Sequence, residues 1–167
     1  MRNPFLIDVG EDLRHPGARR AVTLVGAVPG VALSTARVPD DADVTAELRI
    51  EAQGATVIVQ GTVRAPWVGE CRRCLGPTSG EVAVDLHEVF EQSPVEGDTF
   101  PLLGEQIDLR PVLGETLALG LPLAPLCADD CVGPDPDAHP VGVADDGEGP
   151  PPADPRWAAL DELRFDA

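Results

Sequence analysis

The chain of 167 residues has no lysine and no tyrosine, and it has only three serines. Without lysine it cannot form a Walker-type phosphate site, a Schiff base or a lysine general base. None of the serines, Ser34, Ser79 and Ser93, lies in the G-x-S-x-G turn of the α/β-hydrolases. These absences exclude several large classes of enzyme.

Other catalytic signatures are also missing. His87-Glu88 is not followed by the second histidine of a zinc protease motif, and the glycine-containing segments 26–30 and 114–120 lack a G-x-G-x-x-G frame. Carboxylates are abundant, but no single pair of them stands out. We therefore predict that the protein is not an enzyme and has no small-molecule substrate.

Long apolar runs are absent as well. No run approaches the roughly 20 residues that a membrane-spanning helix needs, and the N-terminus lacks the basic-then-apolar pattern of a signal peptide. We expect a soluble, cytoplasmic protein without membrane contact. In that compartment four cysteines are expected to be free thiols or metal ligands rather than disulfides.

The charge is unevenly distributed. Residues 1–75 carry nine arginines and nine acids, whereas residues 76–167 carry three arginines and 20 acids, which accounts for the whole net charge of −17. Such a charge opposes direct RNA binding, because neutralisation of phosphates drives that binding. The candidate contacts to RNA or to a protein partner are arginines of the first part, although their spacing alone favours solvated surface charge: Arg14, Arg19, Arg20, Arg72 and Arg73.

Alternating apolar and polar residues predict the strands. In residues 44–52 every second residue is apolar, which indicates a strand with one buried face. The same pattern continues in residues 56–64 and, after a turn, in residues 81–90. Shorter apolar runs at residues 5–7 and 21–25 add two more strands. We predict an α+β fold built on an antiparallel β meander, a partly closed sheet.

A helix is predicted over residues 109–120. Asp108 can cap its N-terminus, and Pro111 is tolerated because the amides of the first turn lack intrahelical partners. Apolar residues recur there with helical spacing, so that one face of this helix is expected to cover the sheet: Leu109, Val112, Leu113 and Leu117.

The C-terminal part divides into a linker and a second helix. Residues 132–153 contain six prolines, four glycines and five acids, which predicts a flexible acidic linker. Asp154-Pro155 then begins a helix that is too short to be stable alone, so we expect it to dock through Trp157, Leu160 and Leu163. The predicted organisation is a domain over residues 1–131, the linker and a helix over residues 154–167.

The cysteines form two close pairs, Cys71 with Cys74 and Cys127 with Cys131. Two short-spaced pairs that are separated by a structured segment are typical of a four-cysteine zinc site. Four protein ligands leave no open coordination position, so the predicted role of the zinc is structural. The metal would join the meander to the C-terminal part of the chain.

Residues beside the cysteines affect this predicted site. We expect Gly76 to let the backbone curl around the metal. Zinc with four thiolates carries a charge of −2, which Arg72 and Arg73 can offset in part. Asp129 and Asp130 would act against it.

Three alternatives to zinc remain open from the residues alone: unligated thiols, a redox dithiol and a disulfide framework. A redox dithiol prefers a C-x-x-C at a helix N-terminus, and disulfides need an oxidising compartment. His139 could also serve as a ligand, although a histidine in an acidic linker is usually solvated. Since Cys71, Cys74, Cys127 and Cys131 are the only cysteines, they form one site or none.

Several segments together resemble a known family. Residues 69–77, which contain Cys71 and Cys74, are the most specific of them, and the others are residues 5–8, 13–17, 107–109, 121–127 and 154–160. This pattern resembles the YceD family, the bacterial large-subunit ribosomal RNA accumulation proteins, and the last segment is most similar to its actinobacterial branch.

The resemblance implies a non-enzymatic role in the synthesis, processing or stability of 23S ribosomal RNA. The implied partners are a precursor of the large ribosomal subunit, ribosomal RNA or a basic ribosomal protein. Because of the charge of −17, a basic protein fits better than RNA. A thiol redox or metal-handling protein that uses Cys71 and Cys74 is the alternative hypothesis.

Overall fold

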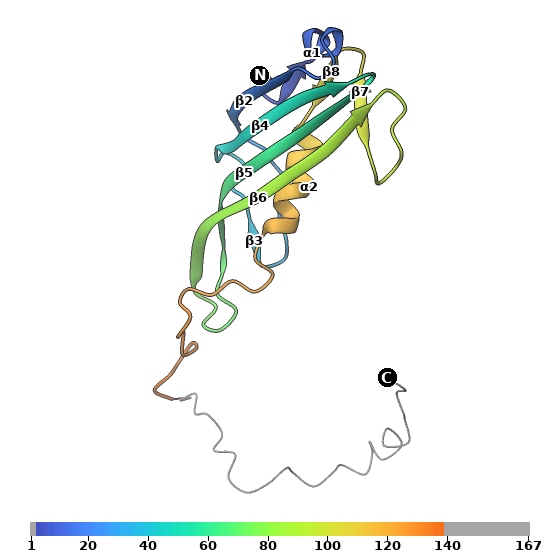
Figure 1. The fold of residues 1–167 in the computed structure, drawn as a ribbon. Coiled ribbons are helices and arrows are strands. Elements are labelled where there is room, and N and C mark those ends of the chain that lie inside the picture. Colours follow the sequence, from blue (N-terminus) through green and yellow to red (C-terminus); the bar gives the residue numbers. More distant parts are fainter. Residues whose placement is uncertain (1–2, 139–167) are drawn as a thin grey trace, which may run out of the picture.

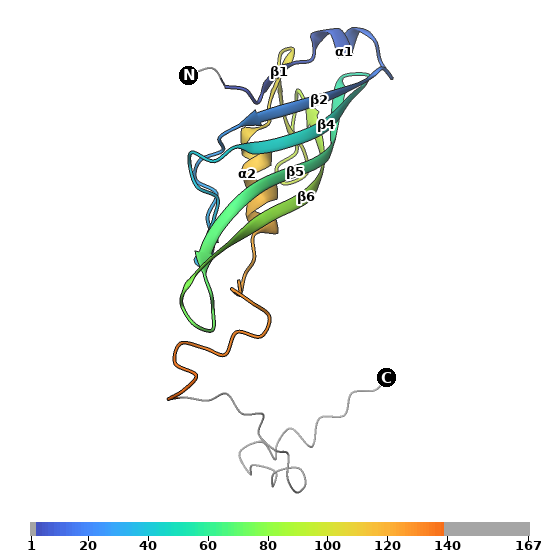
Figure 2. The same cartoon turned by 90° about the vertical axis from the view of Figure 1, so that its left-hand side faces the viewer.

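A computed structural model describes residues 3–138 of the chain. Its main feature is a twisted sheet that curls into half a barrel (Figures 1 and 2). Four neighbouring antiparallel strands form most of it, in the spatial order β2 (Arg19–Gly26), β4 (Val44–Gln53), β5 (Thr56–Glu70) and β6 (Pro77–Glu91). The predicted strands at residues 44–52, 56–64 and 81–90 all lie within these elements, and the α+β class is confirmed.

Short strands complete the sheet. They are β1 (Leu6–Asp8), β3 (Ala36–Arg37), β7 (Phe100–Leu103) and β8 (Gln106–Asp108). The sheet is not a pure antiparallel meander as predicted, because β7 runs parallel to β6 where Phe90 lies opposite Phe100. The loop at residues 92–99 causes this difference, since it carries the chain back to the edge of β6 instead of closing a hairpin.

Two helices lie in the described residues, α1 (Gly10–Arg14) and α2 (Arg110–Gly120). The Asp108 carboxylate accepts the N–H of Arg110 at 3.0 Å, although Leu109 occupies the capping position. Helix α2 packs against β6 and β5. Neither helix is long and apolar enough to cross a lipid bilayer.

The core lies between the concave face of the sheet and α2. It consists mainly of valine, leucine and isoleucine, with Phe5 and Phe90 as its largest fully buried side chains. At the end of α2, Gly120 lies so close to Val82 and Val84 that a Cβ atom would collide with both side chains. The first residues of the predicted linker, 132–138, contain turns, whereas His139 and the predicted C-terminal helix lie outside the described residues.

Candidate metal centre

The first cysteine pair lies in the loop that joins β5 to β6, at the end of the sheet opposite α1 (Figure 1). The Cys71 N–H donates to the Gly76 carbonyl at 2.8 Å, and the Leu75 N–H donates to the Cys71 carbonyl, also at 2.8 Å. These bonds close a tight turn around the buried Cys71. Both sulfur atoms of the pair are thereby brought to one side of the loop.

The sharp bend of this loop occurs at Leu75 rather than at Gly76 as expected. Leu75 has a φ of 59°, in the left-handed region that glycine usually occupies. A Cβ atom at Gly76 would lie 3.4 Å from the Cys74 Sγ atom, which is close to ordinary van der Waals contact.

The second cysteine pair follows α2, where the proline-rich segment 121–126 leads the chain to the β5–β6 loop. Three hydrogen bonds, from the bend before β3, from the β5–β6 loop and from β6, fix this segment by its carbonyl groups. The Thr35 hydroxyl donates to Pro122 at 3.1 Å, the Arg72 N–H to Pro125 at 2.9 Å, and the Thr78 hydroxyl to Leu126 at 3.3 Å. Prolines suit this segment because the ring fixes φ and leaves no backbone N–H that would need an acceptor.

The four sulfur atoms come together at one point. The Sγ atoms of Cys71 and Cys131 are 3.8 Å apart, those of Cys74 and Cys127 are 3.7 Å apart, and all four lie within 4.8 Å of one another. None of the four cysteines forms a disulfide. With Zn–S bonds of about 2.3 Å, a tetrahedral site has S–S edges of about 3.8 Å. The donor set and its spacing therefore fit a zinc ion.

The electrostatics of the cluster are also those of a cation site. Hydrogen bonds from the backbone N–H groups of Cys74 and Cys127 lower the pKa of Cys71 to about 6. In turn, hydrogen bonds with the sulfurs of Cys131, Cys74 and Cys71 raise the pKa of Cys127 to about 12. Four thiolates this close would repel one another without a cation. A divalent cation would offset this repulsion and release the thiol protons on binding.

The predicted arginine contacts lie in two separate places. Arg73 donates to the backbone carbonyls of Asp129 and Cys131, at 2.9 and 3.0 Å, and so holds the second cysteine loop against the first. Arg72 is exposed beside it. The position of the Asp129 carbonyl was not evident from the sequence, in which Asp129 appeared only as an unfavourable charge.

The other three predicted arginines lie at the opposite end of the molecule, in α1 and at the start of β2 (Figure 1). Each forms an ion pair: Arg14 with Glu105 at 3.2 Å, Arg19 with Glu51 at 2.6 Å and Arg20 with Asp12 at 2.6 Å. The five arginines are thus not brought together in one patch. Asp12, which is 7% exposed, is a residue that the sequence analysis missed.

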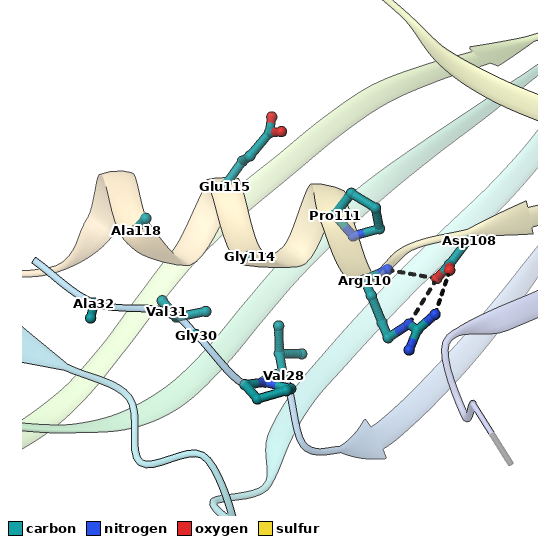
Figure 3. Close-up of a pocket in the computed structure, with 11 residues that line it drawn as sticks. Val28, Gly30, Val31, Ala32, Asp108, Arg110, Pro111, Gly114, Glu115 and Ala118 are labelled. Atoms are coloured by element: carbon teal, nitrogen blue, oxygen red, sulfur yellow. Dashed lines mark hydrogen bonds and ion pairs between the residues drawn. The ribbon is translucent and has the colours of Figure 1, made fainter. Parts of the chain in front are cut away.

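A pocket of about 460 Å³ lies between α2 and the segment 28–32 (Figure 3). Valine, proline and glycine form most of its walls. Its polar groups are Glu115 and the pair of Asp108 and Arg110, whose carboxylate and guanidinium are 2.9 Å apart. No serine, cysteine or histidine is among the described residues that line this pocket.

Known proteins place these features in a family. The family of the large ribosomal RNA subunit accumulation protein YceD matches residues 59–164. An uncharacterized protein of Mycobacterium tuberculosis (strain H37Rv) is 32% identical over 169 residues, which cover 96% of this chain and 82% of that protein. An uncharacterized protein of Mycobacterium leprae is 30% identical over 171 residues, or 96% of this chain and 78% of that protein. No solved structure matches the chain. On these matches, the chain belongs to the YceD family.

Proposed function

We propose that the protein is a non-enzymatic factor that supports the accumulation of 23S ribosomal RNA and the assembly of the large ribosomal subunit, with a structural zinc ion at its cysteine cluster. The name of the family supports the ribosomal role. The observation that carries the zinc site is the approach of four sulfur atoms from two distant segments to within 4.8 Å.

The chemistry of the cluster supports a structural role for the metal. Cys71, Cys74, Cys127 and Cys131 would hold the ion, and four protein ligands leave no position for water or substrate. The ion would cross-link the β5–β6 loop to the segment after α2. In comparable peptide sites such binding contributes roughly 10–16 kcal/mol at neutral pH.

The net charge of −17 favours a basic ribosomal protein as the direct partner over ribosomal RNA. The negative charge would attract such a basic protein and speed the encounter, and it would repel the phosphates of nucleic acid. In our proposal, this contact takes place on a precursor of the large subunit in the cytoplasm.

A thiol redox or metal-handling function is the second candidate, because the pKa of Cys71 is lowered to about 6. A redox thiolate must also be accessible to its partner, and Cys71 is fully buried. Titration of the native thiols at neutral pH, with and without a chelator, separates the two functions. Thiols that react at once support redox chemistry, whereas thiols that react only after chelation support the structural site.

Depletion of the protein in cells tests the ribosomal role. We expect a fall in the ratio of mature 23S to 16S ribosomal RNA, which the wild-type chain restores. Cys127→Ser, which removes one ligand, should restore it poorly, and the exposed loop variant Ser93→Ala should restore it fully. An unchanged ratio after depletion would contradict the proposed function.

A further inference from the structure

Within residues 3–138, the strand β6 has one long edge without a strand partner. It pairs with β5 from Pro77 to Phe90, but with β7 only at Phe90 and Glu91. Within the described residues, no backbone hydrogen bond from a loop reaches residues 79–89. Unpaired strand edges of this length are templates for another extended chain.

The register shows which backbone groups of β6 are free. Cys71 and Gly76 lie opposite each other just before the first pair of the ladder, and the Cys71 N–H donates to the Gly76 carbonyl. Hydrogen-bonded and non-hydrogen-bonded pairs alternate in an antiparallel ladder. The even-numbered residues of β6 therefore bond to β5, and the odd-numbered residues between 79 and 89 direct their N–H and C=O groups outward.

The side chains at this edge are exposed and include two acids. Ser79, Glu81, Ala83, Asp85 and His87 are all exposed. The Asp85 carboxylate accepts a hydrogen bond from the Thr62 hydroxyl at 3.0 Å and keeps its second oxygen for a partner. Arg64 lies 4.0 Å from Glu81, but both side chains are largely exposed, so this pair is weak. On the inner side, Glu88 is close enough to Glu115 of α2 for the two charges to interact.

These charges determine what can occupy the edge. A second copy paired antiparallel about Ala83 would place Glu81 opposite Asp85, which is unfavourable, and phosphates of RNA would be repelled. Within the described residues the outer edges of β1 and β2 also lack a strand partner. β1 has only three residues, and β2 has no charged residue from Ala21 to Val25, so neither edge indicates its occupant. An extended peptide with basic side chains satisfies both the backbone groups and the charge of β6.

We propose that the outer edge of β6, from Ser79 to Val89, binds an extended basic segment of a protein partner by strand addition. Backbone hydrogen bonds from the odd-numbered residues would provide the affinity, and Glu81 and Asp85 would select basic side chains. That this segment belongs to a ribosomal protein rests on the proposed function, whereas the strand addition itself does not.

Hydrogen exchange of the full-length chain tests the free edge, with a synthetic peptide of alternating lysine and valine as the probe. The amides of Glu81, Ala83 and Asp85 should exchange much faster than those of Val82 and Val84, and the peptide should slow them. Odd-numbered amides that are as protected as the even-numbered ones in the free protein would overturn the inference.

Variants of the edge test the mode of binding. Ala83→Pro removes an outward N–H without loss of a bond to β5, so it should weaken peptide binding at least about tenfold, whereas Ala83→Ser should bind as the wild type does. The double variant Glu81→Arg, Asp85→Arg leaves the backbone intact. It should bind a peptide of alternating glutamate and valine more tightly than the lysine–valine peptide. Unchanged binding by both the proline and the arginine variants would overturn the inference.

The cellular readout separates this inference from the proposed function. If depletion leaves the 23S to 16S ratio unchanged, the ribosomal role fails while strand addition still stands on the peptide data. If depletion lowers the ratio and the folded Ala83→Pro chain restores it fully, the ribosomal role stands, and the assignment of the edge to a ribosomal protein is overturned.

Discussion

The side chain of Arg73 connects the two cysteine loops through hydrogen bonds to the carbonyls of Asp129 and Cys131. A guanidinium suits this position because its planar array of donors can bond two oxygens at once. Arg72, the next residue, contributes its backbone N–H to the Pro125 carbonyl. Two adjacent arginines therefore contribute to the same junction by different groups.

This contact predicts a matched pair of variants. Arg73→Ala should weaken zinc binding roughly 10–100-fold, as loss of groups that orient metal ligands commonly does. Arg72→Ala should change it little, since its backbone N–H remains. Competition with a chromogenic chelator measures both affinities. Equal losses of zinc affinity in the two variants would show that the affinity depends on positive charge near the cluster and not on the Arg73 hydrogen bonds.

Arg20 has a structural role at the other end of the molecule. Its guanidinium bonds both carboxylate oxygens of Asp12, at 3.2 and 2.6 Å, and the side chain of Asp12 is only 8% exposed. Arg20→Ala should lower the free energy of unfolding by roughly 1–3 kcal/mol, because it leaves a buried carboxylate without a partner. Arg14→Ala, in an exposed pair with Glu105, should cost less than about 1 kcal/mol. Urea unfolding measures both, and similar losses would contradict this role.

Glu88 gives a prediction for pH. Burial, together with the nearby charge of Glu115, raises the pKa of Glu88 above that of an ordinary glutamate. The folded state thus binds the Glu88 proton more tightly than the unfolded state does. The free energy of unfolding therefore falls as pH rises from the ordinary pKa of glutamate to the raised pKa of Glu88. Glu88→Gln should raise the melting temperature at pH 7 but not at pH 3, and the exposed Glu96→Gln should raise it at neither. An equal rise in melting temperature at pH 7 and pH 3 would contradict the raised pKa of Glu88.

At the scale of elements, helix α2 sets the position of the second cysteine pair. It packs against β6 and β5, and its last residue, Gly120, lies against Val82 and Val84. The proline-rich segment begins directly after this contact. A displaced helix end would therefore move Cys127 away from the β5–β6 loop.

Two glycines of α2 test this contact. Gly120→Ala should destabilise the fold by roughly 1–3 kcal/mol, because the added Cβ collides with both valines. Gly114→Ala should stabilise it by up to about 1 kcal/mol, since its Cβ would lie 3.8 Å or more from Val28 and Val31 and alanine favours the helix. Thermal unfolding measures both. Stabilisation by both substitutions would show that helix propensity, not close packing, governs these positions.

The elements also show how far the sequence alone could predict the fold. The alternation in residues 44–52 predicted β4, because a half-buried strand needs that period. It could not predict that β7 joins β6 in parallel, which depends on the path of residues 92–99. Nor could it predict the bend at Leu75, since the left-handed conformation is imposed by the turn around Cys71 against the preference of leucine.

For the whole molecule, the candidate site depends on contacts between distant segments. The spacing of the cysteines predicted a four-sulfur cluster. It could not predict the hydrogen bonds to the carbonyl groups of residues 121–126, which fix the position of the second pair. The buried core lies between the sheet and α2, whereas the cluster lies at one end (Figure 1). Metal removal should therefore release the two loops and leave the sheet folded.

The metal and thiol content of the purified full-length protein tests the central claim most directly. Elemental analysis should find one zinc ion per chain, and a thiol reagent should detect almost none of the four cysteines until a strong chelator is added, after which all of them should react. Protein that holds no metal and whose thiols react freely in the native state would contradict the structural zinc site.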